Sequence, residues 1–317
     1  MTHRIVLDTD MGSDVDDALC LALAVGSPEI ELVAVTHVSG DTRLRARISK
    51  CLLELAGQPD IPVYAGRERP LAGTGQFVWF GHEGAGILEP GVLAEIEPED
   101  GVAALVRLFR EHDGLELVAV GPLTNVAAAL EKDPELALRI AQLTVMGGHL
   151  RRVVYGGQVF PWGVDYNLCS DPVASLRVLR AGIPTRLVTA DVTLQVWLRE
   201  QDLRQIEAAH SSLHQALARA VRIWTPTMNQ VFGGMGASVK TDNVCFLHDP
   251  LALACTYDES FCTFENLAIE PAVPEGIFRT FERSGVGDGI FRMRCAVAVD
   301  ARRFRSHFVE RIKRLAH

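Results

Sequence analysis

An acidic run near the start of the chain holds the residues best suited to chemistry. Five of its ten residues are aspartates, namely Asp8, Asp10, Asp14, Asp16 and Asp17. The run lies between two apolar segments, residues 4–8 and residues 18–25. Like charges held this close repel one another unless a cation lies among them. Because oxygen ligands suit Ca²⁺ or Mg²⁺, the run predicts a metal site.

The same run also fits two different roles. Ser13 and Asp16 have the spacing of a capping box, and acidic residues are favoured in the first turn of a helix; this accounts for one or two aspartates but not for Asp8 and Asp10. The second role is that of a Mg²⁺-dependent phosphohydrolase. Phosphatases of the haloacid-dehalogenase type also carry Asp-x-Asp after an apolar strand, and Asp8 would then be the nucleophile. Their pattern usually continues with Gly-Thr, whereas three more aspartates follow here.

The elements that would position these residues alternate along the chain. Apolar segments with the character of buried strands are separated by segments with helical spacing. Such strands form a parallel sheet that is covered on both faces. We therefore expect an α/β fold with an open, mostly parallel sheet and helices on both faces, in one catalytic domain over residues 1–317. The expected strands are 4–8, 30–38, 115–120, 143–146, 185–191 and 295–299, and the expected helices are 18–25, 42–56, 123–130, 171–180, 199–209, 213–224 and one from 302.

Three long irregular segments interrupt this alternation, at residues 66–101, 147–165 and 233–243. Long irregular loops in a compact α/β chain are usually functional. Ligands of open α/β sheets bind outside the carboxyl ends of the strands. We therefore expect these loops to lie at the carboxyl ends of the strands, around the acidic run.

The composition excludes several classes of protein. Hydrophobic residues make up 48% of the chain and charged residues 22%, which is a globular balance. The 31 Lys and Arg against 40 Asp and Glu give a formal net charge of −9, which argues against a nucleic-acid partner. The longest basic feature, residues 43–47, has the pattern of a solvated helix face. The apolar run 19–25 is too short to span a bilayer, so we expect no membrane partner. Seven cysteines without Cys-x-x-Cys spacing predict a cytoplasmic protein without a disulfide framework.

Several motifs, in order along the chain, resemble those of the nucleoside hydrolase family, the inosine-uridine-preferring nucleoside N-ribohydrolases. Residues 4–18 are similar to its apolar strand followed by Asp-x-Asp-Pro-Gly-x-Asp-Asp-Ala, with Met11 in place of Pro and a longer run before the Asp pair. Its Gly-Pro-Leu-Thr-Asn strand end is matched by residues 121–125, its Glu-Phe-Asn…Asp-Pro segment by residues 165–172, and its helix-opening His-Asp pair by residues 248–249.

The resemblance implies an enzyme that hydrolyses the N-glycosidic bond of ribonucleosides to free base and ribose. It assigns a Ca²⁺ to the carboxylates of Asp10, Asp17 and Asp249 and to the backbone carbonyl of Val120, with Asp8 supporting them from behind. Such an ion binds a water and the ribose hydroxyls, and Asp10 would activate this metal-bound water as general base. The anionic surroundings favour an oxocarbenium-like transition state. A phosphate substrate would instead require basic residues or a Gly-rich loop after the first strand, and neither follows it here.

The resemblance also names residues that would hold the substrate. Asp16, Asp165 and Asn167 would hydrogen-bond the ribose hydroxyls, with Asp14 as a rival for the position of Asp16. His248 would lie near the leaving base as a second catalytic residue. The family forms dimers and tetramers, so the resemblance implies a homodimer or homotetramer.

Some positions depart from the family's pattern. Asp41 stands where the family usually has an Asn whose amide approaches the sugar. Asp165 replaces the family's usual Glu and is one methylene shorter. Gln158 is the nearest substitute for the Asn that the family has in the loop before residue 165. These departures keep open a family member that binds a nucleoside without cleaving it, and they leave the base and the sugar undetermined. Asn125 is expected to cap the helix after it. Aromatic candidates for contact with the base are His82 and Trp224 first, with Trp79, Phe80, Trp162 and Phe232 beside them.

Overall fold

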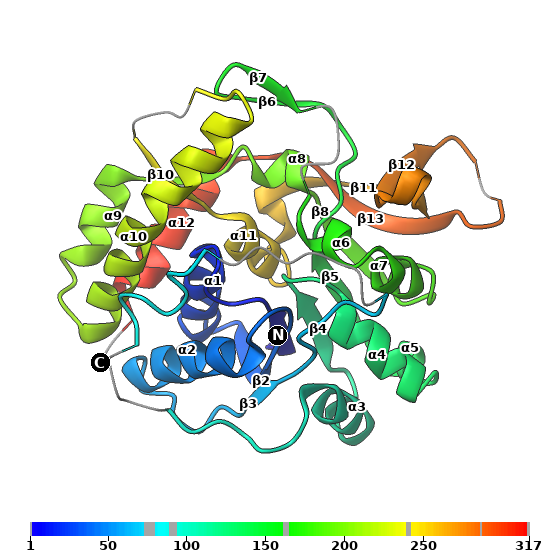
Figure 1. The fold of residues 1–317 in the computed structure, drawn as a ribbon, viewed down its shortest axis with the longest axis horizontal. Helices are drawn as coiled ribbons and strands as arrows, with labels where there is room; N and C mark the ends of the chain where they lie inside the picture. The colour runs from blue at the N-terminus through cyan, green and yellow to red at the C-terminus, as the bar shows by residue number, and fades with distance from the viewer. Residues whose placement is uncertain are drawn as a thin grey trace.

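A nine-stranded sheet runs through the part of the chain that the structure, a computed structural model, describes (Figure 1). The described residues are 2–72, 80–88, 94–160, 165–238, 242–285 and 287–315. The strands lie in the order β12-β11-β13-β8-β5-β4-β1-β2-β3. Their bounds are β1 His3–Thr9, β2 Ile30–His37, β3 Val63–Ala65, β4 Glu116–Ala119, β5 Leu143–Met146, β8 Thr185–Val188, β11 Cys262–Ala272, β12 Arg279–Arg283 and β13 Phe291–Val299.

The sheet is mostly parallel, which confirms the fold class that the sequence predicts. Every pair of neighbours from β3 across to β13 runs parallel. Within this sheet, as far as it is described, the antiparallel pairs are those of β11 with its two neighbours, β12 and β13. The sequence did not predict β11 or β12. They lie at one edge of the sheet, where many of their side chains face solvent, so they lack the continuous apolar run of the central strands.

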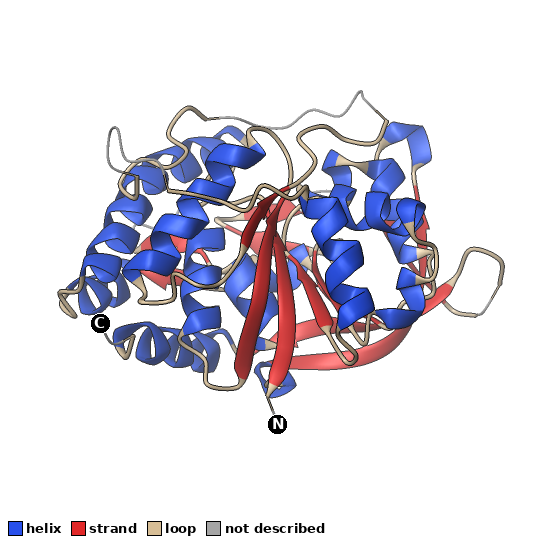
Figure 2. Ribbon diagram, turned by 90° about the horizontal axis from the view of Figure 1, so that it is seen from below, coloured by secondary structure: helices blue, strands red, loops and turns tan. Residues whose placement is uncertain are grey.

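Side chains of the central strands alternate between two cores. In β1, Ile5 and Leu7 belong to one core and Val6 belongs to the other, and all three are 0% exposed. Because successive strand residues point to opposite faces, both faces of the sheet must be covered by helices. Figure 2 shows helices on both sides of the strands.

The helices divide between these two faces. Those that contribute to the first core are α1 Asp16–Val25, α2 Thr42–Leu55, α8 Ala190–Thr193, α9 Glu200–Glu207, α10 Ser212–Gly234, α11 His248–Ala254 and α12 Ala301–Lys313. Those of the second core are α3 Gly101–Glu111, α4 Thr124–Lys132, α5 Leu136–Arg139 and α7 Pro172–Leu179. Among the helices described, none has the length and apolar character needed to cross a membrane.

Short elements complete the described chain. Two small antiparallel sheets pair β6 Val153–Tyr155 with β7 Gln158–Phe160, and β9 Trp197–Arg199 with β10 Asn243–Phe246. The remaining helical turns are α6 Asn167–Ser170, η1 Glu259–Phe261 and η2 Pro274–Gly276. The expected helix at 213–224 is the first half of α10, which continues through Pro226 to Gly234.

The connections reverse direction at β1, and this fixes where a ligand can bind. From β1 the chain moves to β2 and β3 on one side, and then crosses through α3 to β4 on the other side of β1. The loops that leave the carboxyl ends of β1 and β4 therefore diverge. A crevice at such a switch point is the usual ligand site of an open α/β sheet.

Candidate functional site

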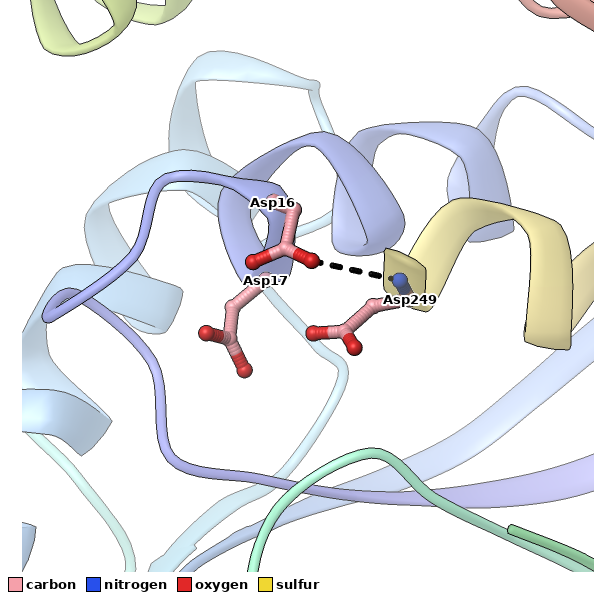
Figure 3. Close-up of side chains that lie close together, drawn as sticks. All are labelled: Asp16, Asp17 and Asp249. Carbon is pink, nitrogen blue, oxygen red and sulfur yellow. Dashed lines mark hydrogen bonds between the residues drawn. The ribbon is translucent and has the colours of Figure 1, made fainter. Parts of the chain in front are cut away.

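The acidic run occupies this switch point. β1 ends at Thr9, and α1 begins at Asp16, so the run spans the loop between them. Helix α1 packs against α11 (Figure 1). This packing brings Asp249 to the start of α1. Carboxylate oxygens of Asp16, Asp17 and Asp249 lie within 4.8 Å of one another, and all three residues are buried. The backbone N–H of Asp249 donates to Asp16 Oδ2 at 3.3 Å (Figure 3).

Asp10 directly follows β1, where its charge acts on Asp16, Asp17 and Asp249, and it lies against the end of β4. It is 6% exposed. A Cβ at Gly121 would lie 2.8 Å from Asp10 Oδ1 and 2.9 Å from Asp10 N, so only glycine fits there without a shift. In the described chain the tight carboxylate group contains Asp16, whereas the ligand set implied by the family resemblance has Asp10. That part of the predicted ligand set, and the carbonyl of Val120, stay predictions.

The electrostatics of the cluster call for a cation. Burial raises the pKa of Asp8 to about 7, and it raises the pKa of Asp16, Asp17 and Asp249 well above the ordinary value. The negative charges of neighbouring aspartates raise them further. In the described part of the chain, Asp8 Oδ2 is buried without a hydrogen-bond partner. Several carboxylates with unused lone pairs and only oxygen donors fit a hard divalent cation.

Residues behind the cluster hold it in place. Asp8 is 0% exposed, and its Oδ1 accepts from Thr36 Oγ1 at 2.6 Å and from Asn125 Nδ2 at 2.7 Å. Asn125 Nδ2 also donates to the carbonyl of His37, and its Oδ1 accepts from the backbone of Arg67. The expectation that Asn125 caps α4 is wrong, because Asn125 lies inside that helix and joins the ends of β1 and β2 to the loop after β3 instead.

The capping box expected for Ser13 and Asp16 is also wrong. Val15 is the N-cap of α1 and makes no capping hydrogen bond with its side chain, while Asp14 Oδ1 accepts from Val15 N at 2.6 Å and from Asp16 N at 3.4 Å. Ser13 Oγ instead accepts from Arg45 Nη2 at 3.0 Å. Asp17 accepts from Thr9 Oγ1 in the strand before it. The carboxylates of Asp16 and Asp17, in the first turn of α1, therefore bond to residues of other elements and do not cap their own helix.

The two residues predicted to bind ribose from a later segment lie along the same edge of the sheet. Asn167 Nδ2 donates to the carbonyl of Val120 at 2.6 Å and to that of Met146 at 3.1 Å, so it bridges the ends of β4 and β5. Asp165 is 5% exposed, and its carboxylate accepts from Leu168 N at 3.2 Å. Burial raises the pKa of Asp165 to about 6.

His248 opens α11 directly before Asp249. Its Nδ1 forms a hydrogen bond of 2.6 Å with Thr193 Oγ1, and its ring stacks on Phe246 with centroids 5.0 Å apart. Burial lowers the pKa of His248 to about 4. The ring is therefore neutral at pH 7 and carries one N–H.

His82 and Trp224 meet beside the acidic run. Their ring centroids are 5.7 Å apart, and His82 Nε2 forms a hydrogen bond of 3.0 Å with the carbonyl of Ser13. In the described chain the buried Trp224 Nε1 has no hydrogen-bond partner. A small cavity is lined by Gly12, Asp14, Val15, Ala18, His82, Gly84, Ala85, Ile87, Ala220, Ile223 and Trp224. Trp79 and Trp162 lie outside the described residues.

Two predicted substrate residues are occupied elsewhere. Asp41 is exposed and caps α2, where its carboxylate accepts from Leu44 N at 2.9 Å. Gln158 lies in the β6–β7 hairpin, where its Nε2 donates to the carbonyl of Val159 and its side chain faces Gly236. Their roles in binding stay predictions.

Arg45 is a residue of this site that sequence reasoning missed. The prediction that residues 43–47 form a solvated face holds for Arg43, which is exposed, but it is wrong for Arg45, which is 0% exposed. Its guanidinium reaches the backbone of the acidic run. Charge density alone does not distinguish a buried arginine from its solvated neighbours. Only the direction in which α2 packs reveals it.

An open α/β sheet with buried carboxylates at its switch point is typical of an enzyme that binds a small ligand with the help of a divalent cation. The sequence model of the inosine-uridine preferring nucleoside hydrolases matches residues 5–306. The chain belongs to this family and is a hydrolase that acts on N-glycosyl bonds.

Individual relatives are similar over most of their length. The pyrimidine-specific ribonucleoside hydrolase RihA of Salmonella enteritidis is 30% identical over 261 residues, which cover 80% of this chain and 79% of the relative. Uridine nucleosidase 1 of Arabidopsis thaliana is 28% identical over 274 residues, covering 83% and 76%. The solved structure of a purine-preferring ribonucleoside hydrolase from Gardnerella vaginalis is similar with a TM-score of 0.84 and 29% identity, covering 98% of both chains.

Proposed function

We propose that this protein hydrolyses the N-glycosidic bond of ribonucleosides, with Ca²⁺ as its cofactor, and releases the free base and ribose. The observation that carries the proposal is the buried group of Asp16, Asp17 and Asp249 at the switch point of a nucleoside-hydrolase chain. Oxygen-only donors favour Ca²⁺ or Mg²⁺ over softer metals. Ca²⁺ accepts the irregular, many-oxygen coordination that clustered carboxylates and sugar hydroxyls offer.

The catalytic work falls to residues at the edge of this group. When bound, the cation supplies positions for a water and the ribose hydroxyls and makes that water easier to deprotonate. Asp10 takes the proton of the attacking water, because its buried carboxylate has a raised pKa and is a stronger base than a solvated one. His248, neutral at pH 7, offers its ring N–H to the leaving base. The buried negative charge favours the cationic transition state over the neutral substrate.

The ribose is held by side chains from both halves of the chain. Asp16 and Asp165 accept hydrogen bonds from ribose hydroxyls, and Asn167 orients the sugar from the end of β5. Asp41 and Gln158 are more distant candidates. Dense hydrogen bonding of this kind fixes the sugar in a reactive geometry.

The base is contacted from the cavity beside the acidic run. His82 and Trp224 offer aromatic surface there, and the Trp224 N–H, unpartnered within the described chain, offers a donor to a base oxygen. Asp14 lines the same cavity and supports the acidic run by accepting from Val15 N and Asp16 N. The names of the relatives include both pyrimidine-specific and purine-preferring enzymes, so the panel of substrates must contain both kinds of base.

We further propose one catalytic domain over residues 1–317, acting in the cytoplasm as a homodimer or homotetramer. The family match over residues 5–306 supports a single domain. All seven cysteines are free, which is typical of a reducing compartment.

Release of ribose from uridine, cytidine, inosine, adenosine and guanosine tests the proposal. Each nucleoside is assayed with Ca²⁺ and with EDTA, for the wild type, Asp10→Asn, and Asp113→Asn as a control at an exposed carboxylate. Ribose release that EDTA and Asp10→Asn abolish supports the proposal. Phosphate release from nucleotides, lost in Asp8→Asn, would support the phosphohydrolase instead. Nucleoside binding without any ribose release would support a binding-only protein.

A further inference from the structure

Arg45 is a fully buried cation on the inner side of α2. It is 0% exposed, although Arg43, two residues earlier on the same helix, faces solvent. A buried charge is costly unless paired and hydrogen-bonded. The contacts of its guanidinium must therefore offset the cost of burying Arg45.

The guanidinium donates in several directions to two loops. Nη1 donates to the backbone carbonyls of Asp10 and Met11, the latter at 2.7 Å. Nη2 donates to Ser13 Oγ at 3.0 Å, and Nε donates to the carbonyl of Ser39 at 2.5 Å. The first three acceptors belong to the loop after β1, and the fourth belongs to the loop after β2.

Both of these loops lack regular secondary structure where Arg45 contacts them. Residues 10–13 contain no helix or strand, and Ser39 has a φ of 70°, a conformation that non-glycine residues rarely adopt. Arg45 links the two loops across the carboxyl ends of neighbouring strands. The loop after β1 begins with Asp10 and leads directly into the first turn of α1, which carries Asp16 and Asp17.

We infer that Arg45 is a positioning residue for the hydrolytic reaction. Its planar guanidinium fixes the loop of residues 10–13, and through that loop it sets the place of the Asp10 carboxylate relative to Asp16, Asp17 and Asp249. Lysine cannot replace it, because one ammonium nitrogen cannot reach acceptors that a planar fork reaches from three nitrogens. The inference rests on the proposed role of Asp10 as the base, but the effect on cation binding can be measured without it.

The test compares Arg45→Lys and Arg45→Met with Arg43→Lys and Arg43→Met, which make the same changes at the exposed position of α2. For each variant, kcat and KM for the best nucleoside are measured together with the Ca²⁺ dissociation constant by calorimetry and the melting temperature. We expect Arg45→Met to lower kcat by about 10²-fold with a smaller change in KM, since misplacing a catalytic group acts mainly on the transition state. Ca²⁺ binding should weaken by about tenfold, as for other residues that orient metal ligands.

Arg45→Lys separates positioning from charge. It keeps the positive charge, so the inference predicts that it reproduces most of the loss in kcat and in Ca²⁺ affinity, while the Arg43 variants stay at wild-type values. If Arg45→Met does not fold, Arg45→Lys decides alone. Wild-type kcat and Ca²⁺ affinity in Arg45→Lys would overturn the inference, and so would a lower melting temperature with both values unchanged. If no nucleoside is cleaved by the wild type, the proposed function fails, while the Ca²⁺ titrations still decide the role of Arg45.

Discussion

Replacing Gly121 by alanine tests whether the end of β4 must approach Asp10 as closely as the structure shows. A Cβ at this position would lie 2.8 Å from Asp10 Oδ1, 2.9 Å from Asp10 N and 3.0 Å from Val38 Cγ1. The carboxylate oxygen could rotate away. The backbone nitrogen cannot, because it continues β1 and the carbonyl of the same residue is held by Arg45.

The size of the effect follows from these distances. Ordinary van der Waals contact begins at 3.4 Å, so the backbone of Asp10 or of Gly121 must move by about 0.5 Å. Overpacking of this kind lowers stability by about 1–3 kcal/mol. Alanine also restricts the unfolded chain more than glycine does, which recovers up to about 1 kcal/mol of that stability. Since misplacing a catalytic group by 1 Å can cost about 10²-fold, we expect kcat to fall about tenfold.

Urea denaturation and ribose release measure the two effects separately. Gly285→Ala is the matched control, because Gly285 has no positive φ and a Cβ there would meet no atom within 4 Å in the described chain. The control should keep wild-type stability and kcat. If Gly121→Ala also kept both, the close approach of β4 to Asp10 would be refuted, and with it the reason for a glycine at this position.

Three further predictions concern the acidic group and its supports. The folded pKa of Asp8 is about 7 against 3.8 for an ordinary aspartate, so in EDTA its contribution to stability is fully present below about pH 4 and is lost as the pH rises through 7. This pKa difference corresponds to about 4 kcal/mol in the free energy of unfolding. In thermal melts, Ca²⁺ should therefore raise the melting temperature more at pH 8 than at pH 5. A melting temperature in EDTA that does not depend on pH would contradict this. Asn125→Ala removes one of the donors to Asp8 Oδ1 and one of the donors to the carbonyl of His37, together with the side-chain acceptor of Arg67 N, and should lower the free energy of unfolding by about 2–3 kcal/mol in urea titrations. Wild-type stability would count against its bridging role. Asp249→Asn removes one charge from the three-carboxylate group and should weaken Ca²⁺ binding by about tenfold or more in calorimetry; an unchanged affinity would exclude Asp249 as a ligand.

The sequence by itself determined the fold class, the order of the central elements and the acidic character of the segment after β1. Short continuous apolar runs are typical of strands buried on both faces. The predicted strand at residues 143–146, for example, coincides with β5. The acidic run had to follow a buried strand, because apolar residues precede it directly. In an open parallel sheet the end of such a strand is where ligands bind. These inferences needed only periodicity and residue type, which are local properties of the chain.

Only the tertiary structure decided which side chains meet. It groups Asp249 with Asp16, 233 residues apart, because α11 packs against α1. It turns Asn125 from an expected cap into a partner of Asp8, and it buries Arg45 in a segment whose charge indicates solvent. No local pattern carries this information, since hydrogen-bonding residues can face solvent, a backbone group or a distant side chain without a change in spacing. The packing of helices on the sheet selects one of these, and burial then makes the selected contacts obligatory.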